Sequence, residues 1–452
     1  MGRLFGTNGV RGVVNRELTA EMILRLASTA SSLLGKNIAL GRDGRTSGLM
    51  FEEAAISGLL SAGCTVYNMG ILPTPALQFS VKHYGLDGGL MLTASHNPPE
   101  FNGLKVIARD GVEVPRELEE SIEALYFRGG PTLCRWDEVG RVQSVNPIED
   151  YETAMLKHVD VELIRRSRFR VAIDPGNGVS ALTAPSVARK LGCAVISINA
   201  ELDGRFPGRG SEPRPDNLEG LRALVEASSA DLGVAFDGDG DRAIFVDERG
   251  EVHWGDRSFA LVARDFIARN PGEAVATPVS SSRAVEDVVK GGGGRIIYTR
   301  VGSVVVSRTM VESGIKLGGE ENGGIFYSPH LPVRDGTMAM ALILDIMARE
   351  GKPLSQLFGG LPRYHQMKER IPCPNHLKER VMGSIRGVVK ASRIETIDGL
   401  KLWYDDGSWI LIRPSGTEPI LRLYAEAGDP SRVSSLIERH KRLVTEAVES
   451  LE

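Results

Sequence analysis

The sequence predicts an α/β protein with three related mixed α/β domains and a smaller C-terminal α+β domain. Three observations predict this fold class. A chain of 452 residues is too long for one hydrophobic core. Short apolar runs typical of buried strands alternate with segments of helical period. Beyond about residue 365 this alternation ends, and two strands around a turn precede one terminal helix.

The individual elements follow from hydrophobic periodicity. Apolar runs indicate strands at 38–40, 89–92, 169–173, 232–236, 243–246, 296–298, 408–412 and 421–425. Helical period indicates helices at 21–34, 51–61, 116–126, 218–228, 257–268, 338–349 and 432–451. This alternation is typical of largely parallel sheets covered by helices.

A weak internal sequence repeat supports the presence of related domains. Apolar strands at 38–40, 171–173 and 274–276 lead into small polar loops at 41–47, 174–180 and 277–283, and each loop opens a helical stretch. The wide spacing indicates three related domains rather than a solenoid, although strand–loop–helix units are common enough to coincide. We expect domains at 1–150, 151–250, 251–365 and 366–452.

Composition excludes several classes of protein. The chain is 42% hydrophobic and 25% charged with a net charge of -4, so no basic surface for nucleic acid is expected. No apolar run is long enough to span a bilayer, and no apolar signal segment follows Met1. The cysteines lie far apart without a Cys-x-x-Cys pair, which favours reduced thiols in a cytoplasmic protein over disulfides or zinc: Cys64, Cys134, Cys193 and Cys373.

An acidic loop follows the expected strand at 232–236. Asp237, Asp239 and Asp241 alternate with glycines, so their carboxylates can converge on a hard cation such as Mg²⁺. An EF-hand calcium loop is the alternative, with Glu248 at its twelfth position. That template requires glycine where Arg242 stands, and the flanking segments indicate strands rather than helices. A solvated acidic turn is the remaining reading.

A second polar loop, 93–99, also ends a strand. Ser95 precedes His96, but adjacency in sequence does not provide the geometry of a nucleophile and its base. No Gly-x-Ser-x-Gly elbow surrounds the serine. Taken alone, a Ser-His-Asn sequence is more often a structural turn or a helix cap.

Two further loops carry groups suited to sugar phosphates. Residues 413–419 lie between two strands, and arginine, hydroxyl and backbone N–H donors there suit a phosphate. Residues 318–324 pair acids and an amide with glycines, which suits sugar hydroxyls. Either loop taken alone could be a plain turn. No Walker-type phosphate loop is present.

Together and in this order, the four loops resemble those of the α-D-phosphohexomutase superfamily. The resemblance covers nearly the whole chain, and the loops 93–98 and 237–242 are highly specific as a pair. The Glu-Glu-Asn-Gly-Gly run at 320–324 is similar to that of archaeal-type members. Further matching segments are 5–12, 41–45, 73–75, 102–105 and 299–302.

The resemblance implies four domains around a central cleft and assigns roles to particular residues. Ser95 would be phosphorylated in the resting enzyme, and an oxygen of its phosphate would join the three aspartates around Mg²⁺. The resemblance places four side chains near the reacting phosphoryl group: Arg11, His96, Lys105 and Arg242. It assigns substrate binding to Thr299, Gly302, Glu320, Asn322, Arg413, Ser415, Gly416 and Thr417.

The implied reaction interconverts hexose 1-phosphates and 6-phosphates of glucosamine, glucose or mannose. Hexose 1,6-bisphosphate is the expected intermediate and activator, and a homo-oligomer is left open. His96 or Lys105 is the candidate general base. Family members often carry serine and histidine where Asn322 and Gly324 stand, so we expect a roomier site with broad sugar choice.

Two other functions share some of these features. A metal-dependent phosphatase would pass the phosphoryl group from Ser95 to water, but it needs no second phosphate site. A non-catalytic sugar-phosphate binding protein would be expected to lose Ser95 or one of the aspartates, and all are present.

Overall fold

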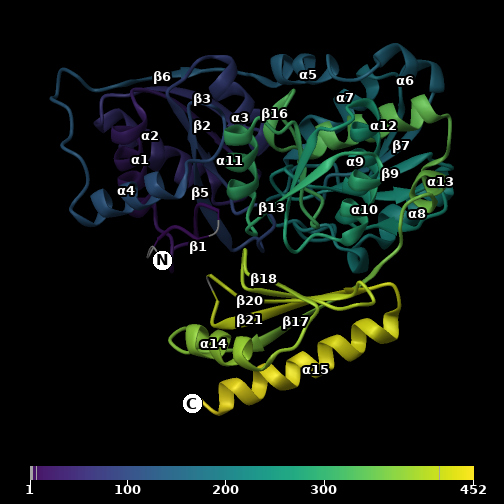
Figure 1. The fold of residues 1–452 in the computed structure, drawn as a ribbon. Helices are drawn as coiled ribbons and strands as arrows, with labels where there is room; N and C mark the ends of the chain where they lie inside the picture. Colours follow the sequence, from purple (N-terminus) through teal and green to yellow (C-terminus); the bar gives the residue numbers. More distant parts are fainter. Residues whose placement is uncertain (1–3, 7, 417, 452) are drawn as a thin grey trace.

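The computed structural model describes residues 4–6, 8–416 and 418–451, which form four β-sheets with flanking helices. Figure 1 shows the first three sheets and their helices lying together, while the C-terminal sheet forms a separate layer below them. The strands and helices expected from hydrophobic periodicity are all present, with ends that differ by about three residues or fewer.

The first domain contains a six-stranded sheet of order β1-β5-β4-β2-β3-β6. Strands β2, β3, β4 and β6 run parallel, and β5 and β1 extend the sheet as antiparallel strands. The strands are β1 (Val10–Val13), β2 (Asn37–Arg42), β3 (Thr65–Ile71), β4 (Gly88–Leu92), β5 (Phe101–Ala108) and β6 (Arg141–Ser144). The helices are α1 (Ala20–Leu34), α2 (Gly48–Ser61), α3 (Thr74–His83) and α4 (Arg116–Phe127).

The second domain contains a five-stranded sheet of order β11-β10-β9-β7-β8. Its strands are β7 (Arg170–Asp174), β8 (Ala194–Ser197), β9 (Leu232–Phe236), β10 (Ala243–Asp247) and β11 (Val252–His253). Its helices are α5 (Ile148–Leu156), α6 (Val161–Ser167), α7 (Ala184–Lys190) and α8 (Glu219–Ser228).

The third domain repeats this order as β13-β12-β14-β15-β16. Its strands are β12 (Ala274–Pro278), β13 (Arg295–Thr299), β14 (Leu317–Gly319), β15 (Ile325–Tyr327) and β16 (Leu331–Arg334). Its helices are α9 (Gly255–Arg269), α10 (Arg283–Gly291), α11 (Ser303–Ser313), α12 (Gly336–Glu350) and α13 (Leu354–Gly359).

The three sheets share one topology, which agrees with the internal repeat in the sequence. Strands β2, β7 and β12 each pair in parallel with the next strand of their domain on one side, and with β4, β9 and β14 on the other. An antiparallel strand then follows β4, β9 and β14. The serine loop (93–99), the acidic loop (237–242) and the sugar loop (318–324) therefore occupy equivalent positions, between the third parallel strand and its antiparallel neighbour.

The C-terminal domain is built differently. Its sheet, of order β17-β21-β20-β19-β18, is entirely antiparallel. The strands are β17 (His365–Pro372), β18 (Arg393–Glu395), β19 (Leu400–Trp403), β20 (Trp409–Pro414) and β21 (Ile420–Ala427), and the helices are α14 (Lys378–Val388) and α15 (Pro430–Glu449). Asp429 caps α15 by accepting from the N–H groups of Ser431 and Arg432.

Hydrophobic packing separates this domain from the rest. One buried cluster combines side chains of the first three domains, among them Leu77, Val171 and Phe259. The C-terminal domain has its own core, which includes Leu402 and Ile437. No helix among the described residues is long and apolar enough to cross a membrane.

Candidate active site

The acidic loop between β9 and β10 brings three carboxylates together. Asp237, Asp239 and Asp241 are each at most 2% exposed, and one oxygen of each lies within 4.8 Å of the others. Gly240 adopts φ +76°, a conformation that a residue with a side chain rarely adopts. A Cβ on Gly238 would lie 2.6 Å from the carbonyl oxygen of Ser95, so glycine allows the acidic loop to touch the serine loop.

Residues of the first domain donate to these carboxylates. Ser95 Oγ donates to Asp237 Oδ2 at 2.9 Å. Lys105 Nζ lies 2.8 Å from Asp239 Oδ2 and 3.3 Å from Asp241 Oδ2. Thr74 Oγ1 donates to Asp239 Oδ2 at 2.6 Å. The predicted serine, lysine and aspartates, distant in sequence, therefore form one site.

The carboxylates differ in their ionisation. Burial, and then repulsion by Asp241 and Asp239, raises the pKa of Asp237 well above its ordinary value. Burial, the largest single influence, also acts to raise the pKa of Asp239, but Lys105, the hydrogen bond from Thr74 and the charge of Arg334 together outweigh it, so the pKa of Asp239 is lowered. Burial would lower the pKa of Lys105, but Asp239 and Asp241 raise it, so Lys105 carries its charge at neutral pH.

The donor set suits Mg²⁺. Asp239 Oδ1 and Asp241 Oδ1 are buried and have no hydrogen-bond partner among the described residues. Buried carboxylate oxygens that lack partners fit a hard divalent cation. The EF-hand alternative fits less well, because β-strands flank the loop and Glu248 accepts from the N–H of Ser355 at 3.0 Å.

A buried arginine shapes the serine loop. Ser95 is fully buried and adopts φ +51°, an uncommon conformation for a residue with a side chain. Arg45 donates to four carbonyl groups of this segment, at distances of 2.6 to 2.8 Å: those of Ser95, Asn97, Pro98 and Phe101. These bonds hold the loop in a conformation that presents Ser95 Oγ to Asp237.

His96 and two arginines surround the serine. His96 Nδ1 lies 3.2 Å from Ser95 Oγ. Burial, and then the charges of Arg242, Arg11 and Arg334, lower the pKa of His96 well below its ordinary value, so the ring is neutral near pH 7. Arg11 Nη1 donates to Asn97 Oδ1 at 2.7 Å, and the N–H of Arg242 donates to Asp237 Oδ1 at 3.1 Å.

The sugar loop is joined to this site through an arginine that no motif singled out. Arg334 Nη1 donates to Glu320 Oε2 at 3.2 Å, and its Nη2 donates to Asp241 Oδ2. Asn322 Oδ1 accepts from the N–H of Gly324 at 3.2 Å, within its own loop.

The other predicted residues of the third domain lie on the β13–α11 connection. Thr299 is 4% exposed and donates to the carbonyl oxygen of Arg300 at 2.8 Å. Gly302 adopts φ +142° and immediately precedes α11.

The predicted phosphate cradle lies on the β20–β21 turn of the C-terminal domain. Arg413 Nε donates to Asp398 Oδ2 at 2.6 Å, and the same oxygen accepts from the N–H of Val301 at 3.0 Å. Lys378 Nζ donates to the carbonyl oxygen of Ser415 at 2.7 Å. Asp398 therefore links Arg413 of the cradle to the third domain. Gly416 follows Ser415 in the turn, and Thr417 lies outside the described residues.

Several residues in these contacts were not assigned a role from the sequence. Thr74 lies in a segment noted only as a family match, at 73–75, and Arg45 lies in the polar loop at 41–47, which the sequence placed after a strand without assigning a role to this residue. Arg334 is the last residue of β16, and Asp335 and Gly336 follow it at the start of α12. This strand, polar turn and helix resemble the strand–loop–helix units that the sequence indicated at other positions. Asp398 and Lys378 carry no sequence signal, because only the fold brings them to the cradle.

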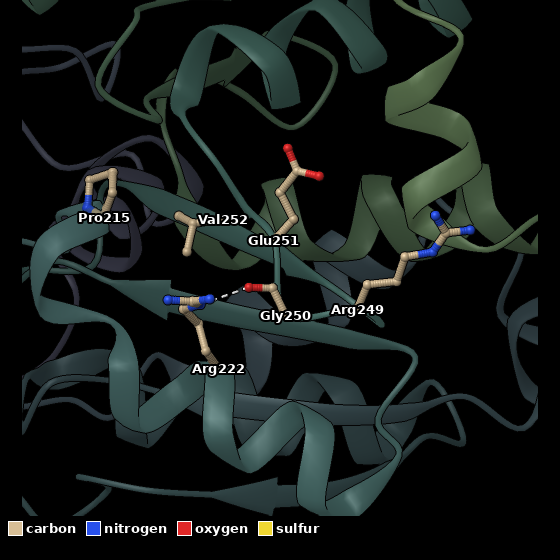
Figure 2. Close-up of a pocket in the computed structure, with 6 residues that line it drawn as sticks. All are labelled: Pro215, Arg222, Arg249, Gly250, Glu251 and Val252. Carbon is tan, nitrogen blue, oxygen red and sulfur yellow. Dashed lines mark hydrogen bonds between the residues drawn. The ribbon is translucent and has the colours of Figure 1, made fainter.

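A surface cavity of about 350 Å³ lies elsewhere on the second domain, beside the β10–β11 hairpin. Arg222 Nε donates to the carbonyl oxygen of Gly250 at 2.8 Å along one side (Figure 2). The residues that line the cavity are Pro215, Arg222, Arg249, Gly250, Glu251 and Val252. None of the sequence-predicted site residues is among them.

Family models match each of the four domains. The description phosphoglucomutase/phosphomannomutase, alpha/beta/alpha domain I, matches residues 2–132. The corresponding domains II and III match residues 149–250 and 254–364, and the C-terminal domain matches residues 370–442.

Relatives align with this chain over nearly their whole length. A phosphoglucomutase/phosphomannomutase of Thermococcus kodakarensis is 41% identical, with 99% of this chain and all of the relative aligned. A phosphoglucosamine/phosphogalactosamine mutase of Sulfurisphaera tokodaii is 43% identical over 98% of this chain and 99% of its own. The crystal structure of a phosphoglucomutase/phosphomannomutase family protein of Burkholderia thailandensis superposes with a TM-score of 0.88, at 28% identity, over 98% of this chain and 97% of that one.

Proposed function

The chain belongs to the phosphoglucomutase/phosphomannomutase family and is a phosphohexomutase, and on that premise we propose that Ser95 carries the transferred phosphoryl group. The observation that supports this most directly is the 2.9 Å contact between Ser95 Oγ and Asp237 Oδ2, where the serine loop meets the acidic loop. A reactive serine beside three buried carboxylates suits phosphoryl transfer, which depends on positioning and charge compensation.

The acidic loop is proposed to hold Mg²⁺ through Asp237, Asp239 and Asp241, with an oxygen of the Ser95 phosphate. When bound, the cation would offset negative charge on the transferring group. The partnerless oxygens of Asp239 and Asp241 support this assignment.

Cationic side chains are proposed to bind the transferring phosphoryl group. Arg11 Nε and Arg242 Nε are buried and have no hydrogen-bond partner in the described part of the chain. Two such donors beside Ser95 suit phosphoryl oxygens. Lys105, which keeps its charge through Asp239 and Asp241, adds to the positive field.

In the proposed first step, the bond from phosphorus to Ser95 Oγ breaks as a bond to a sugar hydroxyl oxygen forms. The hydroxyl proton is taken up within the site, and Ser95 Oγ regains a proton when the serine is released. Neutral His96, at 3.2 Å from Ser95 Oγ, is better placed to accept a proton than charged Lys105. In the second step the other phosphoryl group of the bisphosphate returns to Ser95.

The bisphosphate intermediate must turn around between the two steps, so the non-reacting phosphate needs a fixed holder. We assign that role to the cradle: Arg413, Ser415, Gly416 and Thr417. Thr299 and Gly302, which adjoin the Val301 contact with Asp398, would border the same end of the substrate. Glu320 and Asn322 would bind sugar hydroxyls. This second phosphate site favours a mutase over a phosphatase.

The proposed substrates are hexose phosphates of the glucosamine, glucose and mannose series. Relatives named for glucose, mannose and glucosamine phosphates are similarly identical to this chain. The wide spacing of the cysteines supports a cytoplasmic location.

A coupled assay across glucose, mannose, glucosamine and N-acetylglucosamine 1-phosphates tests the function. Each 6-phosphate product and the released inorganic phosphate are measured together, with hexose 1,6-bisphosphate present or absent. A mutase converts 1-phosphate to 6-phosphate with little phosphate release, and the bisphosphate activates it. Stoichiometric phosphate release without isomer would identify a phosphatase instead.

A further inference from the structure

Arg334 joins the acidic loop of the second domain to the sugar loop of the third. It ends β16, and its side chain is 6% exposed. One terminal nitrogen donates to Asp241 Oδ2 and the other to Glu320 Oε2, the latter at 3.2 Å. A planar guanidinium can serve two carboxylates at once in a fixed geometry, which a lysine ammonium cannot do as rigidly.

The stem of the same arginine fills the space beside Gly324. A Cβ on Gly324 would lie 2.3 Å from Arg334 Cδ and 2.9 Å from its Cγ. The expectation that Gly324 leaves the sugar site roomier is therefore wrong at this position. Glycine admits the arginine, and a histidine at residue 324 could not coexist with the present course of the Arg334 side chain.

The bridge restricts Glu320. Both Glu320 and Arg334 are buried, and a buried carboxylate that loses its cation would be strongly penalised. With Oε2 held by Arg334, the orientation of the carboxylate is set, and Oε1 is the oxygen that remains for a sugar hydroxyl. Discrimination between sugars depends on such fixed polar groups, which the wrong sugar leaves unpaired.

We propose that Arg334 is the positioning residue that sets sugar specificity. Its side chain occupies the space beside Gly324 and holds the Glu320 carboxylate at a fixed position relative to the acidic loop. This inference rests on the proposed function, in which Glu320 binds a sugar hydroxyl. Arg334 acts through Glu320 and Asp241 rather than by touching the reacting atoms.

The first test measures binding and turnover in Arg334→Lys and Arg334→Ala. Calorimetry of glucose 6-phosphate and mannose 6-phosphate, with protein freed of metal by chelation, gives a readout that does not require activity. We expect Arg334→Ala to weaken binding of the preferred sugar about 10- to 100-fold and to bring the two sugars within about threefold of each other. Arg334→Lys should recover part of the affinity but not the discrimination between the two sugars. A lysine restores the positive charge but lacks the planar guanidinium that can bind two carboxylates at once.

The KM and kcat values separate positioning from catalysis. The loss in Arg334→Ala should fall mainly on KM and on the ratio of kcat/KM between sugars. Arg349→Ala is the matched control, because this arginine also bridges two aspartates, Asp265 and Asp345, but outside the site. Arg349→Ala should leave KM and the ratio of kcat/KM between sugars unchanged.

The second test is a double-mutant cycle with Gly324→Ala. The added Cβ displaces the Arg334 stem, so Gly324→Ala alone should reproduce the loss of discrimination. In the Arg334→Ala background the same change should have little further effect, because the stem is gone. If Arg334→Ala does not fold, the sugar preferences of the Gly324→Ala and Arg334→Lys variants still test the role of Arg334.

Two results would overturn the proposal or its premise, and they are distinguishable. Wild-type activity with unchanged affinity and unchanged sugar ratios in folded Arg334→Lys and Gly324→Ala would overturn the role of Arg334. A wild-type protein that isomerises no hexose phosphate would instead overturn the proposed function.

Discussion

Charge compensation at individual residues explains how so many ionisable groups are buried in one place. Asp237, Asp239 and Asp241 repel one another, and Lys105 and Arg334 offset part of that repulsion. One oxygen of Asp239 and one of Asp241 have no hydrogen-bond partner among the described residues. A bound cation could neutralise the negative charge that remains there.

Ser95→Ala should lower turnover at least about a thousandfold, because it removes the hydroxyl that we propose carries the phosphoryl group. Binding of sugar phosphate should persist, since the cradle is unchanged. Intact-mass and peptide spectrometry of the wild type should find one phosphoryl group on Ser95. The control is Ser57→Ala on the exposed face of α2, which should keep both the phosphate and the activity. A fully active Ser95→Ala with its phosphate elsewhere would refute the assignment.

Asp239→Asn should weaken Mg²⁺ binding about a hundredfold or more, measured by calorimetry, because it removes one of the three proposed carboxylate ligands. Chelation should stop wild-type turnover, added Mg²⁺ should restore it, and Ca²⁺ should inhibit. Asp247→Asn provides the control. It alters the other candidate cluster found among the described residues, in which Asp247 contacts His253 at 2.9 Å, and should leave Mg²⁺ affinity intact. The opposite pattern would place the metal at that cluster.

Asp256, in the first turn of α9, should make stability depend on pH. Its Oδ2 is buried without a partner among the described residues. Burial, and then Glu321 and Glu426, raise its pKa from 3.8 to about 7. The folded state therefore retains a proton that the unfolded chain loses, so rising pH between about 4 and 7 lowers the free energy of unfolding.

Asp256→Asn removes this ionisation while keeping the shape of the side chain. The variant should be more stable than the wild type at pH 8, by up to about 4 kcal/mol, and this gain should fall to less than about 2 kcal/mol at pH 5 and vanish near pH 3. Denaturant unfolding at both pH values measures the difference. Asp216→Asn, the same charge change at a side chain that is 72% exposed, is the control. An equal gain at pH 5 and pH 8 would show that ionisation is not the cause.

Among the elements, the equivalent loops after β4, β9 and β14 explain how three domains supply one site. Each of these strands ends a parallel set, and the carboxyl ends of such strands are the usual place for ligands. The serine loop and the acidic loop meet at Gly238, where only glycine fits. The precision of the site therefore depends on contacts between loops as much as on the catalytic side chains.

Gly238→Ala should lower kcat about 10- to 100-fold with a smaller effect on the melting temperature. Its Cβ would lie 2.6 Å from the carbonyl oxygen of Ser95 and displace the serine loop. Steady-state kinetics and thermal unfolding separate the two effects. The control is Gly387→Ala in α14, where a Cβ meets open space and should stabilise the helix by up to about 1 kcal/mol. Unchanged kcat in Gly238→Ala would show that the serine loop tolerates displacement.

At the scale of the whole molecule, the first three domains share a core and the C-terminal domain has its own (Figure 1). A small cluster joins the two parts, in which Val279 packs with Trp403 and Trp409. Lys401 Nζ also donates to the carbonyl oxygen of Val279 at 2.7 Å. Separate cores favour separate cooperative units.

Leu402→Ala should destabilise the C-terminal domain by about 2–5 kcal/mol, because Leu402 is fully buried in its core. Hydrogen exchange followed by mass spectrometry should show faster exchange in β17–β21, α14 and α15 and little change elsewhere. Leu77→Ala, in the shared core, should have the reverse pattern. Uniform acceleration over the whole chain in Leu402→Ala would show that the protein unfolds as one unit.

Local patterns in the sequence were enough to predict the α/β class, the main strands and helices, and the loops that carry Ser95 and the aspartates. Periodicity and glycine-rich polar loops are local signals, so they can be read without the fold. The domain boundaries at 150, 250 and 365 and the roles of the site residues stay predictions.

The tertiary structure alone decided which distant residues act together. Arg334, Asp398 and Lys378 lie outside any recognisable motif, and their partners are far away along the chain. The same holds for Gly324, whose missing side chain suggests an open site until the Arg334 stem is seen beside it. The physical reason is that burial, charge compensation and steric fit depend on neighbours in space, and strand pairing and domain packing choose those neighbours.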